Sequence, residues 1–415
     1  MGRLPRRAFA TAALAALSGL GTAGDVAASP DPAARRGRAA PRAVRGMWLA
    51  TASHRDWPSR TGLSPARQRA ELLAHLDTAV RLRLNTVFFQ VRPAADALWP
   101  SPYEPWSEYL TGVQGRNPGW DPLGTAVREA HVRGLELHAW FNPYRVSGQP
   151  DPGRLAASHP ARVHPDWTVR YGGKLYYDPG LPAVRTFVRT AMLDAVRRYP
   201  VDGVHWDDYF YPYPVPGEVF DDDAAYAEHG TGFSSRAAWR RANIDKLVRE
   251  TAAAIKKIRP GVRFGISPFG VWRNASTDPL GSPTRAGVET YDDLYADTRK
   301  WVKEGWIDYI CPQLYWNIGF AAADYAKLLP WWARVVRGTG VQLYAGEALY
   351  KAGEPAQPAA WQDPAELSRH LTLAAKYPEV KGHVFFAARE AAADRTGAMA
   401  RIVADHYRQP ARPPR

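Results

Sequence analysis

The sequence predicts one α/β domain, a (β/α)8 TIM barrel with enlarged βα loops. Short apolar runs rich in β-branched and aromatic residues alternate eight times with helical patterns between residues 44 and 408. No glycine-rich phosphate loop follows the first run, which disfavours the competing fold, a doubly wound open sheet. With 46% hydrophobic and 23% charged residues among 415, the composition is that of an ordinary globular protein.

The strands and helices of this barrel can be placed along the chain. The eight predicted strands are residues 45–51, 85–91, 135–141, 201–207, 263–268, 307–315, 342–349 and 382–387. Ser64-Pro65 predicts the N-cap and first turn of the first helix, and Asp363 to Glu366 resembles a capping box for the seventh. The other helices are predicted near residues 122–133, 182–199, 235–258, 291–304, 321–337 and 394–407.

Residues 1–28 have the pattern of an export signal. Arg6-Arg7 precedes an apolar run that is too short to span a bilayer stably, and Val26-Ala27-Ala28 resembles a cleavage site. The residues around Arg6-Arg7 resemble a twin-arginine signal, and a general secretory signal with two chance arginines is the alternative. Residues 29–43, rich in Pro, Ala and Arg, are predicted to form a disordered linker, and residues 409–415 a disordered tail. We therefore predict a secreted or envelope-associated protein without an integral membrane segment.

The net charge of +13 does not indicate nucleic-acid binding. Residues 1–44 contain seven Arg against Asp25 and Asp31, which accounts for +5 and leaves +8 for the remainder. That remainder is scattered, and no basic stripe with interleaved aromatic residues occurs. The single cysteine excludes an internal disulfide, and no Cys/His cluster has zinc spacing. The sequence therefore predicts no cofactor and no nucleic-acid partner.

Aromatic and amide side chains recur where the predicted strands end, on the face of a barrel that carries the chemistry. Rings pack against the flat apolar faces of sugars, and amide or charged groups bind the hydroxyls. The residues predicted to line a sugar cleft are Trp48, Gln90, Arg92, Asn142, Tyr144, Arg145, His205, Tyr209, Trp272, Gln313, Tyr315 and Trp316. Within this set, Trp48, Tyr209 and Trp272 are predicted to be stacking platforms. The pattern favours a carbohydrate substrate.

Asp207 and Asp208 are the strongest catalytic candidates. Two adjacent acids at the end of a buried strand are costly unless they are paired or used. We predict Asp208 to be a general acid and Asp207 to tune or orient it, because burial and a neighbouring charge both raise the pKa of a carboxyl group. The structural alternative is a pair of salt bridges to Arg92 or Arg145.

Glycoside hydrolysis by two carboxylates requires a second acid across the cleft. Glu347, at the end of the seventh predicted strand, is predicted to be the nucleophile or base, and an ion pair with Lys351 is its structural alternative. Weaker candidates for the second acid are Asp292, Asp293, Glu390 and Glu104.

Two histidines are predicted to point into the barrel. Strand periodicity places His138 and Trp140 on the inner face of the third strand, and His205 and Asp207 on that of the fourth. A metal site made of His138, His205 and Asp207 would suit a metal-dependent glycan deacetylase. Two hydrogen-bonded core histidines are favoured instead, because no third histidine ligand is evident. A barrel that binds cell-wall glycan without cleaving it is a further alternative.

Five ordered motifs resemble one known family. They are RGMWL at 45–49, NTVFFQVRP at 85–93, HAWFNPYR at 138–145, DGVHWDDYFYP at 202–212 and CPQLYW at 311–316. Together they resemble the glycosyl-hydrolase-like 10 (DUF187) family over about residues 43–390.

The resemblance implies a TIM-barrel glycosidase fold, export to the envelope or beyond and, for one bacterial branch, cleavage of peptidoglycan glycan strands stripped of peptides. It also implies that the Asp207-Asp208 segment is the centre of the active site, and it leaves Glu347 undecided. A substrate-assisted route, in which an N-acetyl group replaces the protein nucleophile, needs one acid and a positioning partner. We therefore predict an exported, monomeric glycoside hydrolase whose partner is a polysaccharide.

Overall fold

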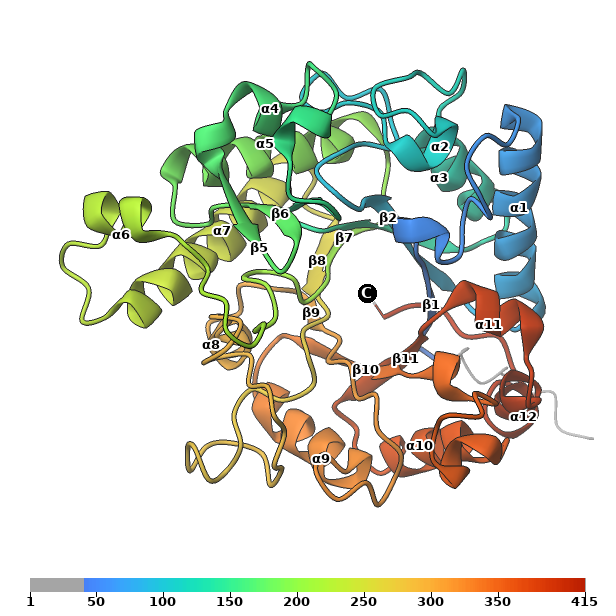
Figure 1. The fold of residues 1–415 in the computed structure, drawn as a ribbon. Helices are drawn as coiled ribbons and strands as arrows, with labels where there is room; N and C mark the ends of the chain where they lie inside the picture. Colours follow the sequence, from blue (N-terminus) through green and yellow to red (C-terminus); the bar gives the residue numbers. More distant parts are fainter. Residues whose placement is uncertain (1–40, 415) are drawn as a thin grey trace, which may run out of the picture. The chain divides into compact units, whose positions relative to one another are not determined.

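Eight parallel strands close into a barrel in the computed structural model of the protein, which describes residues 41–414. Around the barrel they are β1 (Val44–Leu49), β2 (Thr86–Arg92), β3 (Glu136–Phe141), β7 (Gly203–Trp206), β8 (Arg263–Ile266), β9 (Tyr309–Ile310), β10 (Gln342–Glu347) and β11 (Val380–Phe385), which pairs with β1 again. Figure 1 looks down this barrel and shows the helices around it. The predicted TIM barrel is confirmed. The predicted export signal and most of the predicted linker lie outside the described residues.

Helices cover the outside of the barrel. The covering helices are α1 (Pro65–Arg81), α3 (Pro122–Val132), α5 (Pro182–Arg198), α7 (Arg236–Ile258), α8 (Thr298–Lys303), α9 (Tyr325–Val336), α10 (Glu366–Ala374) and α12 (Ala398–Asp405), with the shorter α2 (Glu108–Thr111), α6 (Asp223–His229) and α11 (Ala388–Ala393) in the connections. Ser64 caps α1 by accepting a hydrogen bond from the Arg67 amide, as the sequence predicts. Helix α8 begins later than predicted, because the side chain of Asp297 accepts the Lys300 amide and acts as its N-cap.

The connection between β3 and α5 holds a small antiparallel sheet that the sequence analysis does not anticipate. Its strands are β4 (Arg145–Ser147), β5 (Thr168–Tyr171) and β6 (Lys174–Tyr177), in the order β4-β6-β5, with α4 (Pro160–Val163) beside them. The Tyr171 hydroxyl accepts the Val215 amide at 2.7 Å, and Glu218 accepts the Gly172 amide at 2.6 Å. The small sheet thereby supports the loop that follows β7.

A chain of aromatic and imidazole rings fills the inside of the barrel. The Tyr309 hydroxyl lies 2.9 Å from Nδ1 of His138 and 3.1 Å from Nδ1 of His205. A side chain at Gly203 or Gly265 would collide with these rings, since a Cβ there would lie 2.4 Å from His138 and 2.2 Å from Tyr309. Both histidines are therefore hydrogen-bonded core residues. Within residues 41–414, no group of three or more His, Cys, Asp and Glu side chains is arranged to hold a metal ion.

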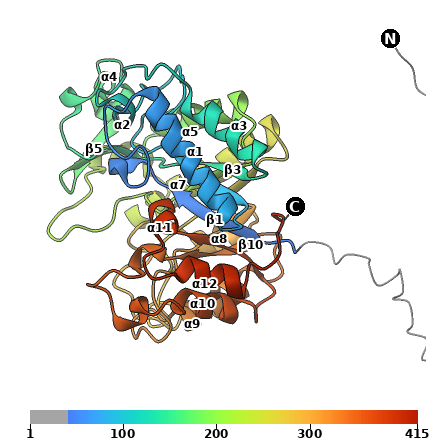
Figure 2. The same ribbon diagram turned by 90° about the vertical axis from the view of Figure 1, so that its right-hand side faces the viewer.

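Residues 409–414 pack against the start of β1, whereas the sequence suggested a disordered tail. The Ala43 amide donates to the Arg412 carbonyl at 2.9 Å, and the Arg412 amide donates to the Pro41 carbonyl at 3.0 Å. The Arg45 guanidinium also donates to the Gln409 carbonyl at 2.7 Å. The backbone amides and carbonyls of the two segments thus find hydrogen-bond partners in each other, and residues 409–414 cover the N-terminal face of the barrel. Figure 2 shows the C-terminal end on the side away from β5. None of the helices in the described part of the chain could cross a membrane.

Candidate active site

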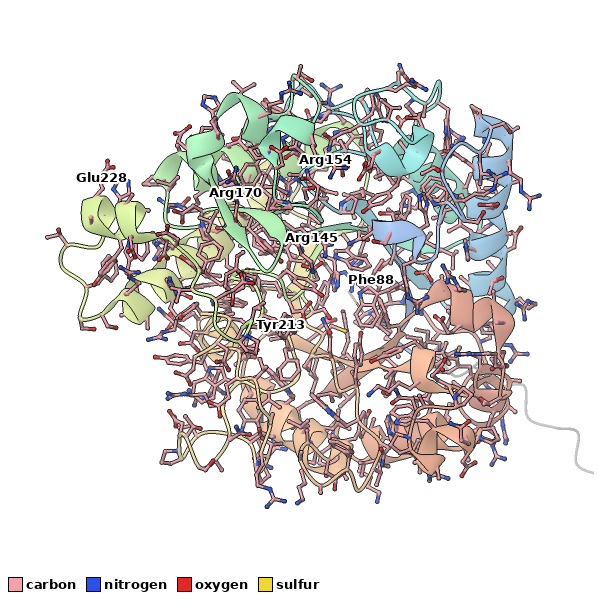
Figure 3. All side chains as sticks on the ribbon, in the orientation of Figure 1. Phe88, Arg145, Arg154, Arg170, Tyr213 and Glu228 are labelled. Atoms are coloured by element: carbon pink, nitrogen blue, oxygen red, sulfur yellow. The ribbon has the colours of Figure 1, made fainter. Side chains whose placement is uncertain are left out.

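A cavity of about 530 Å³ opens at the carboxyl ends of the barrel strands. Nine of the residues predicted for the site line it: Trp48, Gln90, Arg145, Asp207, Asp208, Tyr209, Gln313, Tyr315 and Trp316. In Figure 3, Arg145 and Tyr213 are labelled beside the centre of the barrel, where this cavity opens. Among the described residues that line the cavity, Asp207 and Asp208 are the only carboxylates.

Asp207 faces the cavity from the end of β7, in a position set by the neighbouring strand β3. Its Oδ2 accepts a hydrogen bond from Trp140 Nε1 at 3.0 Å, and its Oδ1 accepts one from Asn142 Nδ2 at 3.0 Å. Burial, followed by the charge of Asp208, raises the pKa of Asp207 to about 6, although these donors and Arg145 oppose the rise. Asp207 is thus a firmly oriented hydrogen-bond acceptor that changes its protonation state in the weakly acidic range.

Asp208 is also buried, and it contacts the loop that follows β7. Its Oδ2 accepts a short hydrogen bond from the Tyr213 hydroxyl. Burial raises the pKa of Asp208, while the hydrogen bonds of Tyr213 and Gln313 and the charge of Arg145 act in the opposite direction. A carboxyl group whose pKa is raised can hold a proton and deliver it, which a general acid must do.

The alternative interpretation of these acids, salt bridges to Arg92 or Arg145, does not describe the contacts. Arg92 pairs with Glu104 instead. Arg145 donates to the Pro93 carbonyl at 3.0 Å and lies 5.1 Å from the ring of Tyr209. Its charge influences the acids through space, and within residues 41–414 neither acid forms an ion pair with it.

Trp48 and Gln90 line the cavity, and hydrogen bonds to neighbouring residues fix their side chains. Trp48 Nε1 donates to Nε2 of His205 at 2.9 Å, which fixes the indole orientation. The side-chain oxygen of Gln90 accepts the amides of Thr51 and Ala52, each at 2.9 Å, and so holds the loop after β1. His205, predicted to bind substrate, lies beneath the cavity and positions Trp48.

Arg92 does not reach the cavity, which corrects its prediction as a sugar-binding residue. The pairing of β2 with β3 shifts between Gln90 and Arg92, so that Arg92 pairs with Phe141. Phe141 belongs to the outer core of the barrel, and Arg92 follows it to that side, fully buried. There its guanidinium forms two hydrogen bonds with Glu104, one of them 2.7 Å long, which removes Glu104 as a second catalytic acid.

Three further residues predicted for the sugar cleft lie behind its wall. Asn142 is buried and orients Asp207, while its own side-chain oxygen accepts the Arg145 amide at 2.8 Å. Tyr144 is completely buried, and the indole of Trp272 donates to Asp297 at 3.0 Å. Asn142 therefore supports the site from outside the cavity, and Trp272 is not a stacking platform in this cavity.

Glu347 lies outside the barrel wall, which contradicts its prediction as nucleophile or base. Its carboxylate accepts the Tyr325 hydroxyl at 2.8 Å and lies 2.8 Å from His370 Nδ1 and 2.9 Å from His383 Nδ1. Burial alone would raise the pKa of Glu347, but His370 and His383 outweigh it and lower the pKa to about 2. Its alternative, a pair with Lys351, is also wrong, because Lys351 donates to the Tyr315 carbonyl at 2.7 Å.

Several lining residues were not identified from the sequence. They are Ala50, Ala52, Arg55, Trp140, Tyr213, Ser267, Phe269, Tyr350, Lys351 and Phe386. Trp140 could have been found, since strand periodicity already places it on the inner face of β3. Tyr213 could not, because it follows the end of β7 by seven residues and its place depends on the folded loop. The lining is therefore more aromatic than predicted.

Comparison with known proteins shows a clear relationship. The model of the family described as glycosyl hydrolase-like 10 matches residues 43–363. The glycosyl hydrolase YngK of Bacillus subtilis strain 168 is 48% identical over 372 residues, which cover 89% of this chain and 73% of the relative. The glycosyl hydrolase DigH of Escherichia coli K12 is 46% identical over 363 residues, which cover 83% of this chain and 82% of the relative.

A solved structure shares the fold at low sequence identity. The α-L-fucosidase isoenzyme 2 of Paenibacillus thiaminolyticus superposes with a TM-score of 0.55 at 12% identity, covering 88% of this chain. The match spans about half of that enzyme, 50% of its chain. This likeness supports the barrel architecture alone.

Proposed function

This chain belongs to the glycosyl hydrolase-like 10 family, and from that premise we propose that it hydrolyses O-glycosidic bonds in peptidoglycan glycan strands that have lost their peptides. The family and the barrel fold support a glycosidase-type function. One observation carries the catalytic proposal. Asp207 and Asp208 are adjacent and largely buried, the pKa of each is raised, and both line a cavity whose walls are rich in aromatic rings. The export-signal pattern of residues 1–28 is consistent with such a substrate, and we propose that a monomer acts on it outside the cytoplasm.

The geometry favours a route in which the substrate supplies the nucleophile. Two-carboxylate glycosidases place acids about 5 to 9.5 Å apart on either side of the bond. Glu347 cannot fill the opposite position, because it lies outside the barrel wall. The described lining offers Asp207 and Asp208, neighbours on one wall, and no further carboxylate. An N-acetyl group on the sugar can replace the missing nucleophile.

In this route each acid has a separate task. Asp208 donates its proton to the glycosidic oxygen while the N-acetyl carbonyl oxygen attacks C1, so the C1–O bond breaks and an oxazolinium ion forms. Asp207, held by Trp140 and Asn142, accepts the N–H of that ion. Water then adds to C1, returns a proton to Asp208 and restores the N-acetyl group.

We predict a bell-shaped dependence of kcat/KM on pH. In the active form Asp207 is ionised and Asp208 is protonated, and burial raises the pKa of both neighbouring carboxyl groups, that of Asp207 to about 6. Activity therefore falls at low pH, where both carboxyl groups carry a proton, and again at higher pH, where both are ionised. Initial rates between pH 4 and pH 9 would show both limbs, with the maximum in the weakly acidic range. A profile that keeps rising to pH 9 would contradict the assignment of Asp208 as the acid.

The substrate proposal is tested by digesting peptide-free peptidoglycan glycan with the purified protein and analysing the soluble products by mass spectrometry. We expect oligosaccharides with new reducing ends and one added water per cleavage. Products lighter by one water would indicate a lyase. Retention of the protein on intact glycan, with no products, would favour the glycan-binding alternative, and loss of acetate alone would indicate a deacetylase.

A further inference from the structure

Lys351 gives the cavity a positive charge away from the two catalytic acids. Among its described lining residues, Arg55, Arg145 and Lys351 are cationic. Arg145 acts on Asp207 and Asp208, whose pKa values its charge lowers. Within residues 41–414, Lys351 forms no ion pair with a carboxylate.

Arg55 differs from Lys351, although both line the cavity. The Arg55 guanidinium forms an ion pair with Glu390 at 2.7 Å and lies 3.4 Å from Asp56. Its charge is therefore compensated within the protein. The Lys351 ammonium follows β10 in a short 3-10 turn (Leu349–Lys351), donates to the Tyr315 carbonyl and lies 5.6 Å from the ring of Trp361.

An ammonium group has three N–H donors, and residues 41–414 accept one of those of Lys351. Burial lowers the pKa of Lys351, which is the cost of holding a cation away from water without a counter-charge. One uncompensated positive charge with free donors suits a single anionic group such as a carboxylate, for which charge-assisted hydrogen bonds are strong.

The walls of the cavity therefore differ in charge. The acids Asp207 and Asp208 follow β7, whereas Lys351 follows β10, three strands further around the barrel. A sugar that carries a carboxylate is attracted to the wall that carries Lys351. This polarity orients the sugar so that its carboxylate meets Lys351 while the glycosidic bond faces Asp208.

We infer that Lys351 is a specificity-determining residue that binds the carboxylate of the lactyl ether on N-acetylmuramic acid. The inference rests on the proposed function and deepens it. When a peptide is attached to this position the carboxylate is replaced by a neutral amide, which offers Lys351 no negative charge. Lys351 therefore favours the sugar with a free carboxylate over the sugar that still carries a peptide.

The test uses a soluble tetrasaccharide of alternating N-acetylglucosamine and N-acetylmuramic acid, and the same tetrasaccharide with its carboxylates converted to methyl amides. Affinity is followed by tryptophan fluorescence, because Trp48, Trp140 and Trp316 line the cavity. We expect the wild-type protein to bind the acid form at least about tenfold more tightly than the amide. Lys351→Met removes this preference, lowering affinity and kcat/KM for the acid by about tenfold and leaving the amide unchanged.

Two further variants make the result specific. Lys351→Arg keeps the charge and retains a preference for the acid. Lys381→Met is the matched control, because Lys381 also donates to a backbone carbonyl but is exposed on β11 outside the cavity, and it behaves as wild type.

Equal loss for the acid and the amide in Lys351→Met, or no preference in the wild type, would overturn the inference. If the wild type cleaves neither glycan, the proposed hydrolysis fails. The binding preference then decides the role of Lys351 on its own.

Discussion

Asp208→Asn is expected to lower kcat for glycan hydrolysis by about 10²- to 10⁴-fold, which is the usual contribution of a general acid. The substitution keeps the shape of the side chain and its contact with Tyr213. It removes only the proton that the leaving glycosidic oxygen requires. Affinity for the intact glycan should stay within about threefold of wild type, since binding depends mainly on the aromatic lining. Single-turnover hydrolysis and fluorescence titration measure the two quantities separately.

The control for this experiment is Asp166→Asn, at an exposed aspartate outside the cavity. It should leave kcat, affinity and thermal stability unchanged. A second comparison is Asp207→Asn, which keeps the general acid but replaces the acceptor for the N-acetyl group. If Asp208→Asn hydrolysed glycan at the wild-type rate, Asp208 would not be the acid, and Asp207 would be the remaining carboxylate in the described lining.

Glu347→Gln is expected to lower the free energy of unfolding by about 3 to 5 kcal/mol, because it removes one partner from a buried charge pair. The amide leaves His383 without this carboxylate, and it leaves His370 with Glu366, 3.2 Å from its Nε2, as its remaining carboxylate partner. Once folded, the variant should retain kcat within about threefold, because Glu347 does not reach the cavity. Denaturant unfolding gives the first quantity and steady-state kinetics the second.

The pH dependence of this loss follows from the two pKa shifts. The pKa of Glu347 is lowered to about 2, so the stabilisation is present above its unfolded pKa, about 4.3, and disappears as the pH falls toward 2. Burial lowers the pKa of His370, but the charge of Glu347 outweighs it, and the net rise means that the stabilisation fades as the pH increases through the raised value. The difference between wild type and Glu347→Gln is therefore largest near pH 5 to 6.

Glu354→Gln is a suitable comparison, since Glu354 forms a partly exposed ion pair with Arg395 at 3.4 Å. Its loss should cost less than about 1 kcal/mol. The opposite effects on activity and stability would show that Glu347 is a catalytic residue. In that case Glu347→Gln would abolish hydrolysis while leaving the unfolding transition in place.

The barrel could be predicted from the sequence because successive side chains of a strand point alternately to its two faces. Alternation along β3 and β7 places Trp140, His205 and Asp207 on the inner face, and the structure has them there. The same rule applied to β10 would have placed Glu347 correctly. Tyr344 belongs to the inner core and Leu343 and Ala345 to the outer one, so Glu347 shares the outer face.

The remaining errors come from features that composition does not reveal. The shift of strand pairing between Gln90 and Arg92 turns the arginine outward. The amino-acid sequence of β2 gives no sign of this shift. The position of Tyr213 depends on a loop held by Tyr171 of the inserted sheet. Loops of this kind are arranged by tertiary contacts, so the residues they bring to the cavity could not be listed in advance.

The hydrogen bonds that join Ala43 to Arg412 also indicate where the enzyme can be attached to a surface or a fusion partner. They bring the start of the barrel and residues 409–414 together at the N-terminal ends of the strands, while the cavity opens at the carboxyl ends. A tag, surface linkage or fusion partner joined after Pro414 would therefore lie across the barrel from the cavity. In an enzyme immobilised through that point, the opening of the cavity faces away from the support, where a long polymer can reach it.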